Sequence, residues 1–182
     1  LHECTQLVEL PAKTMDLVSL CHLDIRNTKL KSMPPLMGNL VKLQTLTDFF
    51  VGKDRGCGIA ELGKLRHLQG ELILRNLQNV TDVQDAIEAN LKDKNLLERL
   101  EYEWEDNDDN SDAYETDMSL LQHLKSPANA KYVAINGYRS TKFPGDSTFS
   151  NVVELDLFQW KCCISLPPLG ELASLRKLVL ND

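Results

Sequence analysis

The chain has 182 residues, enough to bury a hydrophobic core, and its 42% apolar and 26% charged residues are ordinary for a soluble domain. It holds no apolar run long enough to span a bilayer and no signal-type segment, which argues against a membrane span and against secretion. The net charge of −7 comes from residues 103–117, because the remaining chain carries 19 acidic and 20 basic side chains. No basic stripe of the kind that marks nucleic-acid-binding proteins is present.

The five cysteines form an odd set without Cys-x-x-Cys spacing, which argues against a disulfide framework and against a zinc site. They fit a reducing compartment, so we expect a cytoplasmic protein. Because the chain starts at Leu1 rather than at methionine, we also expect it to be a fragment of a longer protein.

The N-terminal segment 1–50 contains an internal repeat, whose period is the interval from Leu23 to Leu46. Seven positions recur at this offset, namely Thr5, Leu7, Leu10, Pro11, Leu17, Leu20 and Leu23, which return as Thr28, Leu30, Met33, Pro34, Leu40, Leu43 and Leu46. An amphipathic helix would repeat at about 3.6 residues, whereas a fixed period of roughly 20–29 residues is typical of leucine-rich repeats.

The same strand core recurs along the rest of the chain, with looser spacing in the middle. The first core positions are Leu23, Leu46, Leu72, Leu100, Val133, Leu155 and Leu178. In the wider intervals we expect a helix near 82–97, capped by Asp82, a second helix from about Asp117 to Lys125, and a mobile acidic loop over 103–117.

The predicted fold is an α/β solenoid, an irregular leucine-rich repeat horseshoe with about seven short parallel strands on its concave face and loops and short helices on its convex face. A single domain covers residues 1–182. Residues 1–50 and 146–182 form regular repeats, and residues 51–145 form irregular ones.

Several stretches resemble the leucine-rich repeat region of plant intracellular disease-resistance proteins of the coiled-coil, nucleotide-binding, leucine-rich-repeat class. They are Leu166 to Leu180, Leu43 to Gly52, Leu77 to Val80, Asp85 to Lys94 ahead of Glu103 and Trp104, and Thr141 to Pro144. The resemblance implies a module that binds a pathogen-derived or host protein and helps to hold the receptor's nucleotide-binding domain inactive. No segment here resembles that nucleotide-binding domain.

Side chains between the core positions of each strand face solvent and are free to serve recognition. We therefore predict a protein-binding surface, with Arg75 and Phe158 as the strongest contributors because arginine and aromatic residues dominate hot spots. The predicted residues are His22, Asp24, Arg26, Glu71, Ile73, Arg75, Arg99, Glu101, Tyr132, Glu154, Asp156, Phe158, Lys177 and Val179.

Other motifs offer alternatives. Gly58 to Lys64 matches a phosphate-binding loop but is followed by Leu65, which lacks the hydroxyl needed for magnesium, so a nucleotide-binding enzyme is a remote interpretation. Asn79 fits a glycosylation acceptor and would suit an extracellular leucine-rich repeat receptor or inhibitor. The spacing from Asp106 to Asp117 approaches a calcium loop without its glycine and glutamate. We predict no catalytic residue, no metal site and no cofactor.

Overall fold

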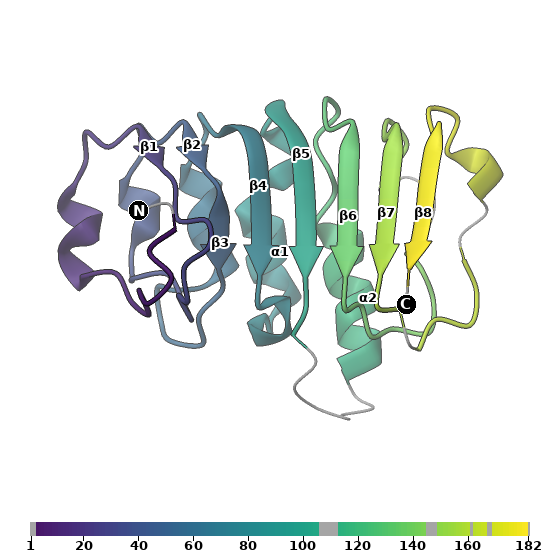
Figure 1. Ribbon diagram of the computed structural model, residues 1–182, viewed down its shortest axis with the longest axis horizontal. Helices are drawn as coiled ribbons and strands as arrows, with labels where there is room; N and C mark the ends of the chain where they lie inside the picture. Colours follow the sequence, from purple (N-terminus) through teal and green to yellow (C-terminus); the bar gives the residue numbers. More distant parts are fainter. Residues whose placement is uncertain (1–2, 106–112, 145–148, 161, 167–168, 182) are drawn as a thin grey trace.

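The computed structural model describes residues 3–105, 113–144, 149–160, 162–166 and 169–181. Its strands run side by side in sequence order, with the helices behind them (Figure 1). The strands are β1 (His22–Leu23), β2 (Thr45–Leu46), β3 (Asp48–Phe50), β4 (Gln69–Arg75), β5 (Leu96–Glu103), β6 (Tyr132–Asn136), β7 (Glu154–Phe158) and β8 (Lys177–Asn181). Strands β1 and β2 form a two-stranded sheet and β3 to β8 a six-stranded sheet, and every pairing is parallel.

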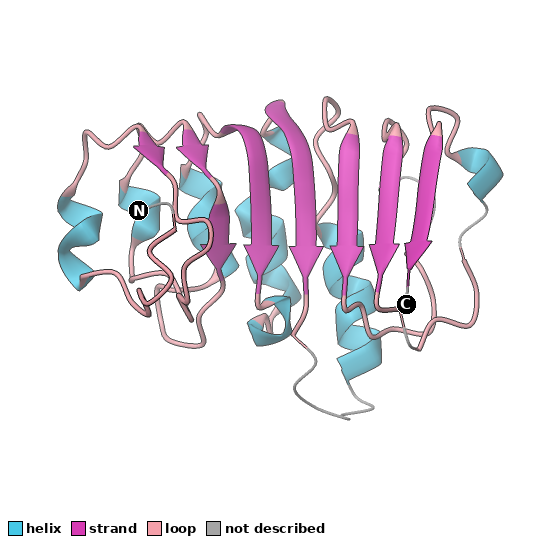
Figure 2. Cartoon of the chain, viewed as in Figure 1, coloured by secondary structure: helices cyan, strands magenta, loops and turns pink. Residues whose placement is uncertain are grey.

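Two α-helices and several short 3₁₀ helices cover one face of the sheet and leave the other bare (Figure 2). The α-helices are α1 (Val83–Ala89) and α2 (Ala113–His123). The 3₁₀ helices are Ala12–Asp16, Met37–Asn39, Ile59–Lys64, Leu77–Asn79, Leu91–Asp93 and Leu169–Glu171. This parallel sheet with one covered face is the architecture of a leucine-rich repeat solenoid.

The predicted core positions lie in register across the six-stranded sheet. Leu72, Leu100, Val133, Leu155 and Leu178 are paired in one row. Two positions further along, Leu74, Tyr102, Ile135, Leu157 and Leu180 form a second row. The side chains of the first four strands in each row are almost completely buried, so these two rows form the centre of the core. The predicted strand cores of this sheet are confirmed.

The N-terminal repeats keep the predicted offset but do not continue straight into the larger sheet. Leu23 pairs with Leu46, as the repeat period predicts. However, β3 pairs Asp48 with Ile73, a register that sets Thr47 rather than Leu46 opposite Leu72. At this slip the Thr47 hydroxyl accepts the amide hydrogen of Ile25 at 3.1 Å, while the Thr47 carbonyl oxygen accepts the amide hydrogen of Ile73 at 2.9 Å.

The helix predicted near 82–97 is shorter than expected. Asp82 caps its start as predicted, since its Oδ1 accepts the Gln84 amide hydrogen at 2.8 Å. Asn90, however, has left-handed dihedrals (φ 49°, ψ 48°) and ends α1, which a short 3₁₀ helix at Leu91–Asp93 and strand β5 then follow. Asparagine tolerates left-handed dihedrals better than most residues. The helical spacing of apolar residues therefore extends past Asn90, although the helix itself ends there.

The acidic segment 103–117 is only partly the loop that composition predicted. Glu103 is the last residue of β5, and Asp117 is buried within α2, which begins four residues earlier than expected. Trp104 Nε1 donates to Asp117 Oδ1 at 3.0 Å, and Arg139 donates to both oxygens of the same carboxylate. This charge pair fixes one end of the segment. The predicted loop at 106–112 lies outside the described residues, as does most of the calcium-like spacing.

Candidate protein-interaction surface

The bare side of the six-stranded sheet, here called the strand face, carries the outward-facing side chains of β3 to β8. Buried and partly exposed residues alternate along β4, where Leu72 and Leu74 are buried while Glu71, Ile73 and Arg75 are half-buried. Because neighbouring strands are in register, these outward residues meet in rows across the sheet. One row joins Glu71, Arg99, Tyr132, Glu154 and Lys177, and the next joins Ile73, Glu101, Ala134, Asp156 and Val179.

The structure brings together eleven of the fourteen predicted residues on this face. The other three lie at the N-terminal sheet. His22 lies in β1 with its Nδ1 3.0 Å from the Thr45 hydroxyl, and Asp24 and Arg26 follow that strand and pair with each other at 2.6 Å. These three residues are separated from the larger group by the register slip at Thr47.

Arg99 and Tyr132 form a partly exposed pair at the centre of the first row. The Arg99 guanidinium lies 3.7 Å from the centroid of the Tyr132 ring, and its Nε lies 3.9 Å from Glu71 Oε1. A cation over an aromatic face gains about 0.5–1 kcal/mol at an exposed site. The contact holds the guanidinium over the ring before any partner binds. Less side-chain entropy is then lost on binding, which favours a role for Arg99 in recognition.

Arg75 joins three strands at the far end of the face. Its Nε donates to Asp48 Oδ1 at 2.6 Å, and its Nη1 forms an ion pair with Glu103. Its guanidinium also lies 5.6 Å from the centroid of the Phe50 ring. Burial raises the pKa of Glu103, and the charge of Arg75 opposes that shift. Arg75 is therefore held by its neighbours and is only 31% exposed.

The prediction that Asp156 is exposed is wrong, since its exposed fraction is 7%. The cause is Tyr132, which reaches across from β6 and donates its hydroxyl hydrogen to Asp156 Oδ2 at 3.0 Å. Burial and this bond together raise the pKa of the Tyr132 phenol well above its usual range. Asp156 therefore belongs to an outward row of the strand face but is covered by Tyr132.

Sequence reasoning missed several residues of the face, among them Asp48, Phe50, Glu103 and Asn136. Glu103 and Asn136 continue the alternation of β5 and β6, so the spacing could have located them. Asp48 and Phe50 belong to β3, whose register departs from the repeat, and no pattern in the sequence marks that departure.

The phosphate-loop match is a packing motif. Gly58 to Lys64 includes the 3₁₀ helix Ile59–Lys64, and the side chains of Leu62 and Leu65 are completely buried. Gly63 is required by close packing, because a Cβ there would lie 2.1 Å from the Glu88 carbonyl oxygen of α1. Gly63 therefore has a structural reason that involves no phosphate.

Two further sequence motifs are also used structurally. Asn79 Nδ2 donates to the Val51 carbonyl at 2.8 Å, so the atom that a glycan would occupy already holds two repeats together. Trp160 packs with the core aromatics, since its ring centroid lies 5.0 Å from that of Tyr138 and 5.5 Å from that of Phe143. Within the described ranges, no group of three or more His, Cys, Asp or Glu side chains is placed to hold a metal ion.

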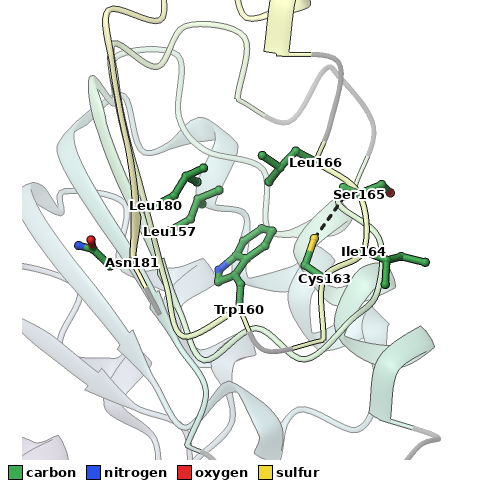
Figure 3. A pocket seen from close by; sticks show the side chains of 8 residues that line it. All are labelled: Leu157, Trp160, Cys163, Ile164, Ser165, Leu166, Leu180 and Asn181. Atoms are coloured by element: carbon green, nitrogen blue, oxygen red, sulfur yellow. Dashed lines mark hydrogen bonds between the residues drawn. The ribbon is translucent and has the colours of Figure 1, made fainter.

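An apolar groove lies beside β8, away from the strand face (Figure 3). Its lining includes Leu157 and Leu180 from the inward-facing row, together with Trp160 and the exposed Ile164. Cys163 Sγ donates to the Ser165 carbonyl oxygen at 3.2 Å along one wall. Because inward-facing residues line it, we assign this groove to the packing layer of the solenoid.

Parallel strands in register with one covered and one bare face define a leucine-rich repeat solenoid. The family model of R13L1/DRL21 LRRs matches residues 59–182. The chain belongs to this leucine-rich repeat family and forms the repeat region of an NLR-type plant disease-resistance protein.

Similar curated proteins carry the same assignment. The chain is 37% identical over 144 residues to putative disease resistance RPP13-like protein 1 of Arabidopsis thaliana, a match that covers 74% of this chain and 14% of that protein. It is 36% identical over 185 residues to putative disease resistance protein RGA4 of Solanum bulbocastanum, covering 100% of this chain and 18% of that protein. Disease resistance protein RGA2 of the same species is 35% identical over 148 residues, covering 79% and 15%. The chain therefore spans less than a fifth of these relatives.

No α-helix in the described parts of the chain is long and apolar enough to cross a bilayer.

Proposed function

We propose that the chain is the protein-recognition module of an intracellular plant innate immune receptor, located in the cytoplasm. In this role it contributes to recognition of a pathogen effector or host protein and to autoinhibition of the receptor's nucleotide-binding domain. The solenoid curves into a horseshoe, and the strand face is its concave side. The module itself binds no cofactor and catalyses no reaction.

The observation that supports this proposal is the continuous strand face. Outward side chains of β4 to β8 lie in register over five adjacent strands, and the centre of the face combines the Arg99 guanidinium with the Tyr132 ring. Arginine and tyrosine are the residue types that dominate binding energy at protein interfaces. The sheet supplies a rigid support for them, because the core beneath β4 to β7 is almost completely buried.

Surface plasmon resonance between the immobilised chain and the nucleotide-binding domain of a receptor of this class tests the proposal. We expect binding, and we expect the double variant Arg99→Ala/Tyr132→Ala to bind about thirtyfold or more weakly, since truncation of a hot spot costs at least about 2 kcal/mol. Glu88→Gln on α1, exposed on the covered side of the sheet, is the matched control and should leave affinity unchanged. Equal affinity of the double variant and the unmodified chain would move recognition away from the strand face.

A further inference from the structure

The strand face has an excess of carboxylates between β3 and β7. Five of them, here called the acidic cluster, share this area with Arg75 and Arg99. The charges of Arg26, which is paired with Asp24, and of Lys177 also reach the cluster, at Asp48, Glu71 and Asp156. The members of the acidic cluster are Asp48, Glu71, Glu101, Glu103 and Asp156. Glu154, also on β7, is already paired with Lys177 of β8.

The two arginines do not neutralise this excess. Arg75 is shared between Asp48 and Glu103, and Arg99 approaches Glu71 only at 3.9 Å because it stacks on Tyr132. Within the described residues no salt bridge joins Glu101 to a cation. Burial and the neighbouring charges of Glu71 and Glu103 raise the pKa of Glu101, although the charges of Arg99 and Arg75 oppose that shift.

Buried acceptor atoms without a donor also indicate that the strand face has too few positively charged donors. In the described part of the chain, three buried side-chain polar atoms have no hydrogen-bond partner, namely Asp48 Oδ2, Asn136 Oδ1 and Asp156 Oδ1. All three are oxygens, and all three belong to strands of the six-stranded sheet, on its outward rows. A buried acceptor without a donor is unfavourable, so the face as it stands lacks N–H donors.

The two carboxylates in this set, Asp48 and Asp156, lie at opposite sides of the acidic cluster. Each has one oxygen engaged by a partly exposed side chain, Arg75 or Tyr132. Asp48 is on β3 and Asp156 on β7, four strand spacings apart, which corresponds to about 19 Å at ~4.8 Å per spacing.

This span is too wide for one metal ion or one small organic cation, and the negative charge disfavours nucleic acid. Lysine and arginine side chains provide both the positive charge and the missing N–H donors. We propose that the strand face recognises a basic segment of a partner protein, whose lysine and arginine side chains bind the acidic cluster. This inference rests on the proposed function and names the chemistry of the partner.

Selection from a random dodecapeptide phage library against the chain, at physiological ionic strength, tests this chemistry. Selected peptides are synthesised, and their affinities are measured by fluorescence anisotropy beside versions in which glutamine replaces every lysine and arginine. We expect enrichment of lysine and arginine, and loss of binding in the glutamine versions.

Substitutions in the chain locate the site. Glu101→Gln/Asp156→Asn should weaken the basic peptides by about tenfold, as removal of two ion pairs of roughly 0.7 kcal/mol each predicts. Glu101→Gln alone, at a position outside any salt bridge among the described residues, should weaken them about threefold and remains informative if the double variant fails to fold. Glu88→Gln removes the same charge from the opposite side and should change affinity by less than about twofold.

Three outcomes would overturn the inference. The first is enrichment of acidic or uncharged peptides. The second is equal weakening of binding by Glu88→Gln and Glu101→Gln, which would indicate general attraction to the net charge of the chain. The third is no peptide binding at all. If acidic or uncharged peptides are selected and Arg99→Ala/Tyr132→Ala abolishes their binding, the strand face is still the recognition surface. Only the proposal of a basic partner is then wrong. Peptides insensitive to every strand-face substitution would count against the proposed function as well.

Discussion

The N-terminal repeats, up to Leu46, and the central repeats, from Gln69 to Asn136, cover the back of the sheet with different structures. Behind the first strands lie 3₁₀ helices of five and three residues. Behind the central strands lie the α-helices α1 and α2, of seven and eleven residues. The strands differ in the same direction, since β1 and β2 have two residues each while β4 and β5 have seven and eight.

Repeat length explains this difference. The interval from Leu23 to Leu46 is shorter than the interval from Leu72 to Leu100, and the interval from Leu100 to Val133 is longer still. A short interval leaves room for only one tight 3₁₀ turn, and the longer ones hold two or three α-helical turns. The longer repeats also bury more polar groups, among them Lys94 and Asp117. The regular repeats therefore have short 3₁₀ helices behind short strands. The irregular repeats have α-helices behind long strands and bury more polar groups.

The largest expected effect concerns the attachment of α2. Asp117→Ala removes the buried carboxylate that Trp104 and Arg139 share, and loss of one partner from a buried ion pair costs about 3–5 kcal/mol. Urea denaturation followed by tryptophan fluorescence measures this loss. Glu115→Ala, at an exposed position of the same helix, is the control. A change below about 1 kcal/mol would show that α2 contributes little to the central repeats.

Matched core truncations compare the two regions directly. Leu100→Ala, at a completely buried position in β5, should cost about 3–4 kcal/mol and shift the fluorescence transition, because Trp104 and Trp160 both lie in the six-stranded sheet's half of the chain. Leu23→Ala, in the two-stranded sheet, should cost about 2 kcal/mol and leave that transition nearly in place, since repeats contact mainly their neighbours. Equal shifts would show that the two sheets unfold as one unit.

A further effect depends on pH and concerns Lys94, which links two central repeats. Its Nζ donates to the carbonyls of Leu62 and Leu65 at 2.7 and 3.0 Å, and burial lowers its pKa to about 8 from the ordinary lysine value of 10.5. The folded state then binds fewer protons than the unfolded state between those two values, so stability rises with pH across this window.

The measured quantity is the free energy of unfolding of the unmodified chain minus that of a Lys94→Met variant. This difference should rise by at most about 3 kcal/mol between pH 7.5 and pH 10.5, at about 1.36 kcal/mol per unit of pKa shift. Urea titrations at both pH values measure the difference, and subtraction cancels the titration of tyrosines and other lysines. A constant difference between the two proteins would mean that Lys94 keeps an ordinary pKa in the fold.

Much of the strand face could be predicted because strands alternate with a period of two and the repeat sets their register. Glu71, Arg99 and Tyr132 were located this way, and the structure places them in one row. The alternation says which side a residue faces, but not which neighbour covers it. Asp156 was therefore predicted to be exposed although Tyr132 buries it, and the Arg75 cluster was missed because Asp48 depends on a one-residue slip at Thr47.

The sequence by itself determined the class of fold, the strand cores and the family, because a fixed period of leucines is local information repeated along the chain. Only the tertiary structure decided where α1 ends, which polar side chains are buried and how the charges of the strand face are shared. These features arise from contacts between residues 13 to 45 positions apart, such as Trp104 with Asp117 and Asn76 with Lys31, and the spacing of leucines along the chain carries no information about such contacts.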